Sequence, residues 1–275
     1  MTQEHGDTRA AWNTIAAGYD KTNTETQQWL GSETVRRAGL TSGMRFLDVA
    51  AGSGALSLPA ARLGAKVLAT DLSPAMLALL RERARRENLD IETRVMDGQN
   101  LELDNNSFDM AGSQFGVMTF PDQPRGIREM TRVVKPGGRV VMTVYGSPAE
   151  IDFLGLFVGA VHSVRPDFVP SMDPPPPEFR LADPEKLRGE LVEAGLKQVQ
   201  VDHIMESTEF KTPKFLWEWI IYSNPIVEMI LGMLSVTDDE RGTIERTMFR
   251  LWQERAGTSG VATLRAPVNI GWGTK

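Results

Sequence analysis

Apolar and polar positions alternate along the first half of the chain in a way that predicts a repeated strand–helix order. Short apolar runs typical of strands occupy 45–50, 66–71, 92–97, 108–114 and 139–145, and helical stretches fall between them at 55–63, 74–88 and 124–134. Ser73-Pro74 and Pro124 mark helix starts, since proline fits the first helical turn. This alternation is typical of a parallel sheet with helices on both faces.

The pattern changes after Tyr145. Residues 150–164 are apolar and could be helical, a proline-rich connector follows at 173–177, and an amphipathic helix (184–194) precedes a sixth strand (198–204). A helical insertion spans roughly 213–255, and 268–272 predicts the last strand. We expect an α/β fold: a doubly wound, seven-stranded, mostly parallel, Rossmann-like sheet in one domain over 1–275. Its cofactor-binding core would be 10–145, with lid insertions at 146–180 and 205–260.

Composition narrows the classes of function. The 275 residues are 41% hydrophobic, carry a net charge of −6 and include no cysteine. The charges are mixed without a basic stripe, which argues against nucleic-acid binding. The lack of cysteine excludes disulfides, thiolate metal sites and cysteine nucleophiles. No acidic group shows a metal-ligand pattern, and no apolar stretch reaches the ~20 residues of a membrane span. With a polar start at Met1–Arg9, the expected protein is soluble and cytoplasmic.

The strongest candidate site lies at the strand ends. Residues 47–54, Leu-Asp-Val-Ala-Ala-Gly-Ser-Gly, run from a strand into a glycine turn and on to a helix, which allows backbone N–H groups to approach a ligand closely. Asp48, Asp71 and Asp97 then fall at the ends of three successive strands. In a parallel sheet these ends meet at one edge, where Asp71 could accept hydrogen bonds from ribose hydroxyls and Asp97 from an exocyclic amino group such as that of adenine.

Six motifs in order resemble the class I S-adenosylmethionine-dependent methyltransferases over about residues 10–204. They are Trp12–Asp20, Asp48–Gly54, Thr70–Leu77, Asp97–Leu101, Ser113–Met118 and Arg128–Gly138. The first of them is similar to the N-terminal segment of the ubiquinone- and menaquinone-biosynthesis branch. One departure concerns the acid-x-Gly-x-Gly-x-Gly motif, whose first glycine is replaced here by Ala50.

The resemblance implies S-adenosyl-L-methionine as cofactor, with S-adenosyl-L-homocysteine as product. The cofactor-binding residues that it implies are Tyr19, Asp48, Ala50, Gly52, Gly54, Asp71, Leu72, Met76, Asp97, Gly98, Gln99 and Ser113. The competing cofactor is NAD, whose Gly-x-Gly-x-x-Gly fingerprint would need glycine where Ser57 stands.

The expected reaction transfers a methyl group to an oxygen or carbon of a small, apolar or aromatic acceptor. The two insertions are rich in aromatic residues and methionine, so we expect them to form an acceptor-binding lid. The candidate acceptor residues are Phe115, Phe153, Phe157, Trp217 and Tyr222. His162 is the candidate base, because histidine titrates near neutrality. The alternative is that it lies on a helix surface or makes a structural hydrogen bond.

Four other interpretations stay open. The lid residues could form a homodimer interface or simply pack the helices onto the sheet. The scaffold could also bind the cofactor and run non-methylating, cyclase-like chemistry, or act as a non-catalytic regulatory subunit. Fold alone does not separate these, because function belongs to the site.

Overall fold

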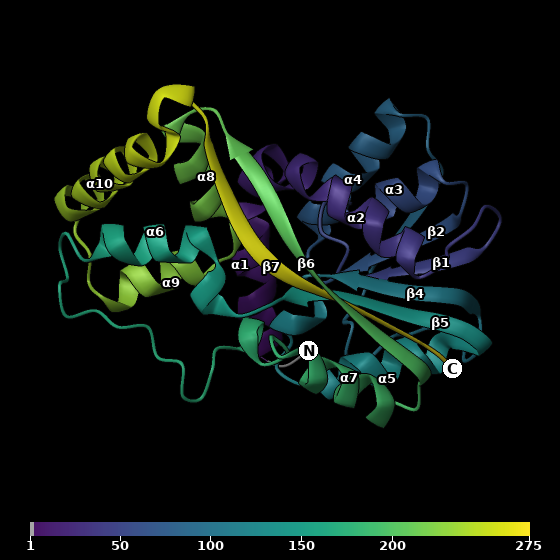
Figure 1. Ribbon diagram of the computed structural model, residues 1–275. Coiled ribbons are helices and arrows are strands. Elements are labelled where there is room, and N and C mark those ends of the chain that lie inside the picture. The colour runs from purple at the N-terminus through teal and green to yellow at the C-terminus, as the bar shows by residue number, and fades with distance from the viewer. Residues whose placement is uncertain (1–2) are drawn as a thin grey trace.

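A seven-stranded sheet forms the centre of the molecule (Figure 1). The computed structural model describes residues 3–275, with side chains from residue 6 onward. The strand order is β3-β2-β1-β4-β5-β7-β6, and only β7 runs antiparallel to its neighbours. The strands are β1 (Arg45–Val49), β2 (Lys66–Asp71), β3 (Ile91–Val95), β4 (Phe108–Gln114), β5 (Val134–Tyr145), β6 (Lys197–Phe210) and β7 (Ala262–Thr274). The predicted fold class is confirmed.

Helices cover both faces of the sheet (Figure 1). One face carries α2 (Glu25–Arg37), α3 (Ser57–Arg62) and α4 (Pro74–Arg86), and the other carries α5 (Gln123–Val133) and α7 (Pro184–Glu193). The side chains of the central strand β1 show why both faces of the sheet are covered. Phe46 of β1 packs into the cluster that contains Leu30 of α2, whereas Leu47 packs into the cluster that contains Ile127 of α5. Neighbouring residues of a strand point to opposite faces, so an apolar run is buried on both sides.

The remaining helices form a lid beyond one end of the sheet (Figure 1). They are α6 (Asp152–Val161), α8 (Pro213–Ser223), α9 (Ile226–Met233) and α10 (Asp238–Ala256). Their shared core includes Phe157, Trp219, Leu231 and Met248. Asn224-Pro225 separates α8 from α9, and α10 begins at a capping box in which Thr237 and Glu240 bond each other's backbone.

A long hairpin connects the sheet with this lid. Residues 205–210 of β6 pair with 262–267 of β7, so both strands continue well past the predicted 198–204 and 268–272. The helical part of the second insertion begins at Pro213, as predicted, whereas residues 205–210 at the start of the predicted lid region belong to β6. In the sequence, the polar residues of this extension look like part of an insertion and not of a strand. The reason is that the lid covers only one face of the two extended strands.

The chain enters the fold through a continuous helical segment. Helix α1 (Gln3–Tyr19) passes into a π-helical turn, η1 (Asp20–Thr24), and then into α2. Short 3₁₀ turns follow at η2 (Val117–Thr119), η3 (Pro148–Glu150), η4 (Pro177–Phe179) and η5 (Gly257–Ser259). Helix α1 contacts both α4 and α8, so it bridges the sheet half and the lid. Within residues 3–275, no helix has the length and apolar character needed to cross a bilayer.

Gly31 of α2 lies against the loop that follows the glycine turn, so a larger residue there should destabilise the fold. A Cβ at Gly31 would lie 2.2 Å from the Ala55 carbonyl oxygen. Despite the better helix propensity of alanine, Gly31→Ala should lower the free energy of unfolding by about 1–3 kcal/mol, the usual cost of overpacking. Urea denaturation measures this change.

Gly189 of α7 supplies the matched control, because a Cβ there meets nothing within 4 Å. Gly189→Ala should leave the stability unchanged or raise it by up to about 1 kcal/mol. Equal effects of the two substitutions would contradict the close approach of α2 to the loop at Ala55.

Candidate cofactor and acceptor site

The glycine turn after β1 holds three residues with left-handed backbone. The φ angles are +56° at Ala50, +54° at Gly52 and +103° at Gly54. Ala50 thus adopts a backbone conformation that favours glycine, at a cost of about 1 kcal/mol for its Cβ. A Cβ at Gly54 would lie 2.3 Å from Leu80 Cδ1, so Gly54 allows α4 to pack against the turn and does not line the cavity described below.

Asp71 joins this turn to the end of β2. Its Oδ2 accepts a hydrogen bond from the Gly52 N–H (2.8 Å), and its Oδ1 accepts one from the Ser73 N–H (2.7 Å). The parallel register that pairs Val49 with Thr70 brings these groups together. Burial raises the pKa of Asp71, while the N–H donors oppose that rise. The carboxylate is therefore fixed in direction before any ligand arrives.

Asp48 lies beneath the turn. It is fully buried, and its Oδ2 accepts a hydrogen bond from Ser57 Oγ (2.5 Å), while Oδ1 has no partner among the described residues. Burial raises the pKa of Asp48 to about 7, with a further contribution from Asp71. Asp48 does not line the cavity, so it supports the turn from below.

The loop after β3 is braced in a similar way. Asp97 Oδ1 accepts a hydrogen bond from the Gln99 N–H (2.9 Å), and Gln99 Oε1 accepts one from the Asp122 N–H (2.9 Å). A Cβ at Gly98 would lie 2.5 Å from Phe120 Cζ, so glycine is needed for this loop to lie against Phe120. Ser113 ties the ends of β1 and β4 by donating to the Val49 carbonyl (2.8 Å), and it too lies outside the cavity.

These strand ends surround one cavity, which we name the cofactor cavity. The predicted residues that line it are Tyr19, Ala50, Gly52, Asp71, Leu72, Met76, Asp97, Gly98 and Gln99. Residues not singled out for it from the sequence also contribute: Thr8, Trp12, Met96, Gln114, Phe115, Gly116, Thr119, Phe120 and Pro121. Several of these residues fall inside the six motifs named above. The sequence feature that could have identified them as lining residues is their position directly after a strand.

The charge of the cofactor cavity is one-sided. Its described lining contains the carboxylates of Asp71 and Asp97 but no Lys, Arg or His. Such a lining favours a ligand with hydrogen-bond donors and positive charge over one that carries phosphates, which basic groups usually bind. Across the described chain, no group of three or more His, Asp or Glu side chains is arranged to hold a metal ion.

A second, apolar cavity of about 650 Å³ opens beneath the lid, and we name it the acceptor cavity. It shares Trp12, Tyr19, Phe115 and Thr119 with the cofactor cavity, so the two meet at these side chains. Its other walls come from α2, α6, α8, α9 and the segment 168–179. Its size and apolar lining are typical of a small-molecule site.

Phe115 and Tyr19 form the junction of the two cavities. Phe115 has a φ of +56°, an unusual backbone conformation that places its ring against Tyr145, 4.4 Å between centroids in a stacked pair. The Tyr19 hydroxyl is enclosed although part of its ring lines both cavities. Desolvation, together with Asp71 and Asp48, raises the pKa of Tyr19 to about 12, so this hydroxyl stays protonated at neutral pH.

The predicted acceptor residues divide into two groups. Phe153 and Phe157 line the acceptor cavity, as Phe115 does. Trp217 and Tyr222 do not: the Arg241 guanidinium lies 6.0 Å from the Trp217 ring centroid, and Tyr222 packs on Gly18. Apart from the side that carries Lys214 and Glu218, helix α8 is apolar, so its residue pattern does not indicate that Ile220 and Ser223 face the cavity instead.

His162, the predicted base, lies on the outside of the lid. It is exposed just after α6, and its Nε2 forms a hydrogen bond with the Phe168 carbonyl (2.7 Å). It lines neither the cofactor cavity nor the acceptor cavity. The position therefore gives its proposed role in proton transfer no support, and fits the alternative of a structural hydrogen bond.

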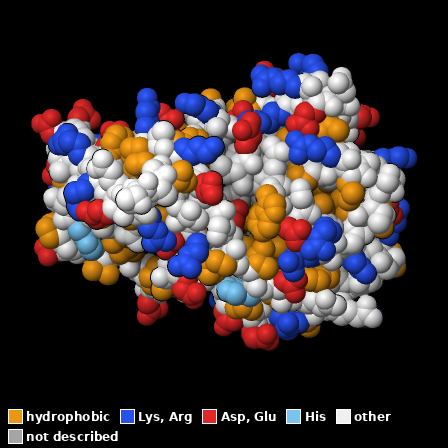
Figure 2. Space-filling view, turned by 45° about the horizontal axis from the view of Figure 1, so that its top comes forward, with side chains coloured by type: hydrophobic (Ala, Val, Ile, Leu, Met, Phe, Trp, Pro, Cys, Tyr) orange, Lys and Arg blue, Asp and Glu red, His pale blue; other side chains and the backbone are white. Residues whose placement is uncertain are grey.

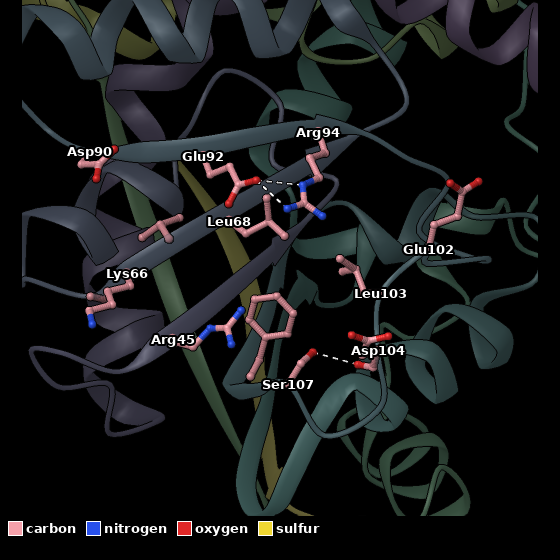
Figure 3. A pocket seen from close by; sticks show the side chains of 13 residues that line it. Arg45, Lys66, Leu68, Asp90, Glu92, Arg94, Glu102, Leu103, Asp104 and Ser107 are labelled. Carbon is pink, nitrogen blue, oxygen red and sulfur yellow. Dashed lines mark hydrogen bonds and ion pairs between the residues drawn. The ribbon is translucent and has the colours of Figure 1, made fainter.

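A separate hollow lies on the face of the sheet where no helix connects β3 with β4 (Figure 3). Two of its charged side chains bond each other, through the hydrogen bonds from Arg94 to Glu92 (2.6 and 2.8 Å). Arg45 and Lys66, the first residues of their strands, place this hollow toward the amino edge of the sheet. It is therefore remote from the strand ends at Asp48 and Asp71. On the face drawn in Figure 2, acidic and basic side chains are intermingled without a large patch of one sign.

Comparisons with known proteins find their matches over the part of the chain that contains these strand ends. Residues 47–142 match the family described as "Methyltransferase domain". An uncharacterized protein of Mycobacterium tuberculosis is 37% identical over 147 residues, 54% of this chain and 52% of that protein. A demethylmenaquinone methyltransferase of Clavibacter sepedonicus is 33% identical over 153 residues, 54% of this chain and 62% of that protein. The matched part thus spans between half and two thirds of these relatives.

The fold comparison agrees. A putative methyltransferase structure from Bacillus halodurans aligns with a TM-score of 0.57 at 19% identity, covering 89% of this chain and 98% of that one. At this identity the alignment concerns the fold. The matched family and the strand order of the sheet confirm the resemblance to the class I S-adenosylmethionine-dependent methyltransferases that was drawn from the sequence, with the family match covering residues 47–142.

Proposed function

We propose that this chain transfers the methyl group of S-adenosylmethionine to an oxygen or carbon of a small, apolar or aromatic acceptor. The observation that carries this proposal is the meeting of the two cavities at Tyr19 and Phe115. One cavity bears carboxylates at strand ends, and the other is a large apolar space. Methyl transfer needs such an arrangement, because donor and acceptor atoms must be aligned and shielded from water.

The residues of the cofactor cavity fit S-adenosylmethionine. Asp71, held by the backbone N–H groups of Gly52 and Ser73, would accept hydrogen bonds from the ribose, and Asp97 lies where it would face the adenine. The absence of basic residues from the described lining suits a cation and disfavours NAD with its pyrophosphate. When bound, the cofactor supplies a methyl group on a positively charged sulfur.

The chain's own contribution to the reaction is mainly alignment. Phe115 and Trp12 lie between the cavities, and α1 closes over the site from Thr8 to Tyr19. These side chains would exclude water and hold an acceptor against the cofactor. The acceptor class is supported by Phe153, Phe157 and other apolar walls. The name of the Clavibacter sepedonicus relative, demethylmenaquinone methyltransferase, also supports this acceptor class, because the acceptor in that name is a quinone.

Formation of S-adenosylhomocysteine tests the proposed function directly. The protein is incubated with S-adenosylmethionine and either 1-naphthol or a short-chain demethylmenaquinol, and the products are measured by mass spectrometry. We expect S-adenosylhomocysteine and methylated acceptor in equal amounts. Conversion of an acceptor without S-adenosylhomocysteine would instead favour the cyclase-like alternative, and binding without any conversion the regulatory one.

Asp71→Ala should weaken S-adenosylmethionine binding. Loss of a fixed, partly buried charged acceptor usually costs about 1–3 kcal/mol, which corresponds to a rise in Kd of roughly 5- to 150-fold. Isothermal titration calorimetry measures this, with Asp90→Ala as control because Asp90 is exposed and lies in the hollow of Figure 3. Unchanged affinity in Asp71→Ala would remove the proposed ribose contact.

Val227→Trp should obstruct the acceptor cavity without affecting the cofactor. Val227 of α9 is buried and lines the acceptor cavity, so the larger ring would occupy space meant for the acceptor. We expect the KM for a demethylmenaquinol acceptor to rise about tenfold or more, the effect of roughly 1.4 kcal/mol of lost binding. Met229→Trp is the control, since Met229 lies on the same helix with 56% of its surface exposed. Equal KM values in the two variants would contradict the assignment of the cavity.

A further inference from the structure

A small chamber lies behind the acceptor cavity and shares one wall with it. Gln27, Tyr145 and Phe153 line both spaces. The chamber is completed by residues of the long hairpin and the lid: Glu206, Thr208, Phe210, Trp219, Leu264, Arg265 and Ala266. Neither the motifs nor the proposed function assigns a role to this chamber.

Glu206 is the notable group in the chamber. It lies on β6 with 4% of its surface exposed, opposite the small side chain of Ala266. Its carboxylate forms no hydrogen bond and no ion pair with the described residues. Burying an unpaired carboxylate costs free energy, so such a group is more typical of a functional site than of a structural core.

Two other ionisable residues belong to the described lining of the chamber. Tyr145 comes from β5, and Arg265 comes from β7. Arg265 is largely exposed and lies 3.8 Å from Asp152 Oδ2, so its charge is turned toward α6. Burial raises the pKa of Glu206 to about 7. Burial, Glu206 and Tyr19 raise the pKa of Tyr145, so the tyrosine keeps its proton at neutral pH.

Between this shared wall and the cofactor cavity lie polar side-chain atoms that have no hydrogen-bond partner among the described residues. Gln114 lines the cofactor cavity, and its Nε2 donates to the Gln27 carbonyl (3.0 Å). The Oε1 atoms of Gln114 and Gln27 have no hydrogen-bond partner among the described residues. The largely apolar acceptor cavity therefore has a polar side at Gln27 and Tyr145, next to Phe115 at the junction of the two cavities. Glu178, whose Oε2 has no hydrogen-bond partner among the described residues, is a further polar group in the lining of this cavity.

We propose that the acceptor carries a hydroxyl group at this polar side, and that Glu206 takes up the hydroxyl proton through Tyr145. This inference rests on the proposed function. Tyr145 would contact the acceptor and act as a catalytic residue, whereas Glu206 acts through it as a positioning residue and final proton acceptor. His162 is not needed for this step.

The step balances as follows. The acceptor oxygen forms a bond to the methyl carbon, and the carbon–sulfur bond breaks with its electron pair remaining on sulfur. The acceptor O–H bond breaks, its proton passes to the Tyr145 oxygen, and the proton of Tyr145 passes to Glu206. The products are the methyl ether, S-adenosylhomocysteine and a neutral Glu206, which loses its proton to solvent before the next cycle.

The first test needs no acceptor. Glutamate labelled with ¹³C at the δ-carboxyl carbon is followed by NMR across pH, and Glu206→Gln identifies the signal. We expect a midpoint near the pKa of about 7. We expect Tyr145→Phe to raise it by about 0.5 unit or more, because in the proposed relay the Tyr145 hydroxyl, which is not bonded to Glu206 in the structure, turns to donate to the carboxylate. Glu209→Gln, an exposed position on the same strand, should leave the midpoint unchanged.

A midpoint at the ordinary glutamate value, or one that does not respond to Tyr145→Phe, would overturn the pairing of Tyr145 with Glu206. This holds whether or not the protein methylates any probe, so it is separate from a failure of the proposed function. Thermal melting checks that Glu206→Gln is folded; the variant should melt at or above the wild-type temperature at pH 8.5, since it lacks a buried unpaired charge.

The second test follows S-adenosylhomocysteine formation with 1-naphthol as acceptor. For the wild type, kcat/KM should rise with pH through the Glu206 titration and then level off. Glu206→Gln should lower kcat about 100-fold or more and remove this rise, with the Kd for S-adenosylmethionine unchanged, and Glu209→Gln should behave as wild type. An unaltered pH profile in Glu206→Gln would refute the proton relay while leaving the proposed function intact.

Discussion

The bond from the Gly52 N–H to Asp71 is the interaction on which the site depends. It links the turn after β1 to the end of β2, two segments that are joined in space only because the strands are parallel and in register. Through Ser73, the same carboxylate also fixes the start of α4. A ligand that binds Asp71 therefore meets a group whose orientation is already determined, which lowers the entropy lost on binding.

Much of this arrangement follows from the sequence. The alternation of apolar runs and helical stretches is sufficient to predict the sheet, and the rule that parallel strands end at one edge places Asp71 and Asp97 together. Asp48, Gly54 and Ser113 belong to the same motifs, yet they support the site from behind. A motif indicates that a residue is needed near the ligand, and it does not distinguish contact with the ligand from support of the turn.

The lid was less predictable, for a physical reason. Helix α8 and its neighbours are apolar on several sides because they pack against one another as well as against the cavity. Periodicity then gives no single inward face, and Trp217 could not be separated from Ile220. Glu206 was missed for a related reason: it lies where β6 continues beyond the sheet, and a polar stretch in such an extension has no pattern that marks its buried side.

The buried carboxyl groups differ in how their charge can be compensated. Asp48 and Glu206 both have pKa values raised to about 7, so between their ordinary values and neutrality the folded protein holds protons that the unfolded chain has lost, and its stability falls as pH rises. A cationic cofactor near Asp48 and Asp71 would offset that cost on the sheet side. Glu206 lies outside the cofactor cavity, in the chamber behind the acceptor cavity, where a proton can neutralise its charge. A fold that keeps an acid in that position, beside a tyrosine that stays protonated, is suited to receive one.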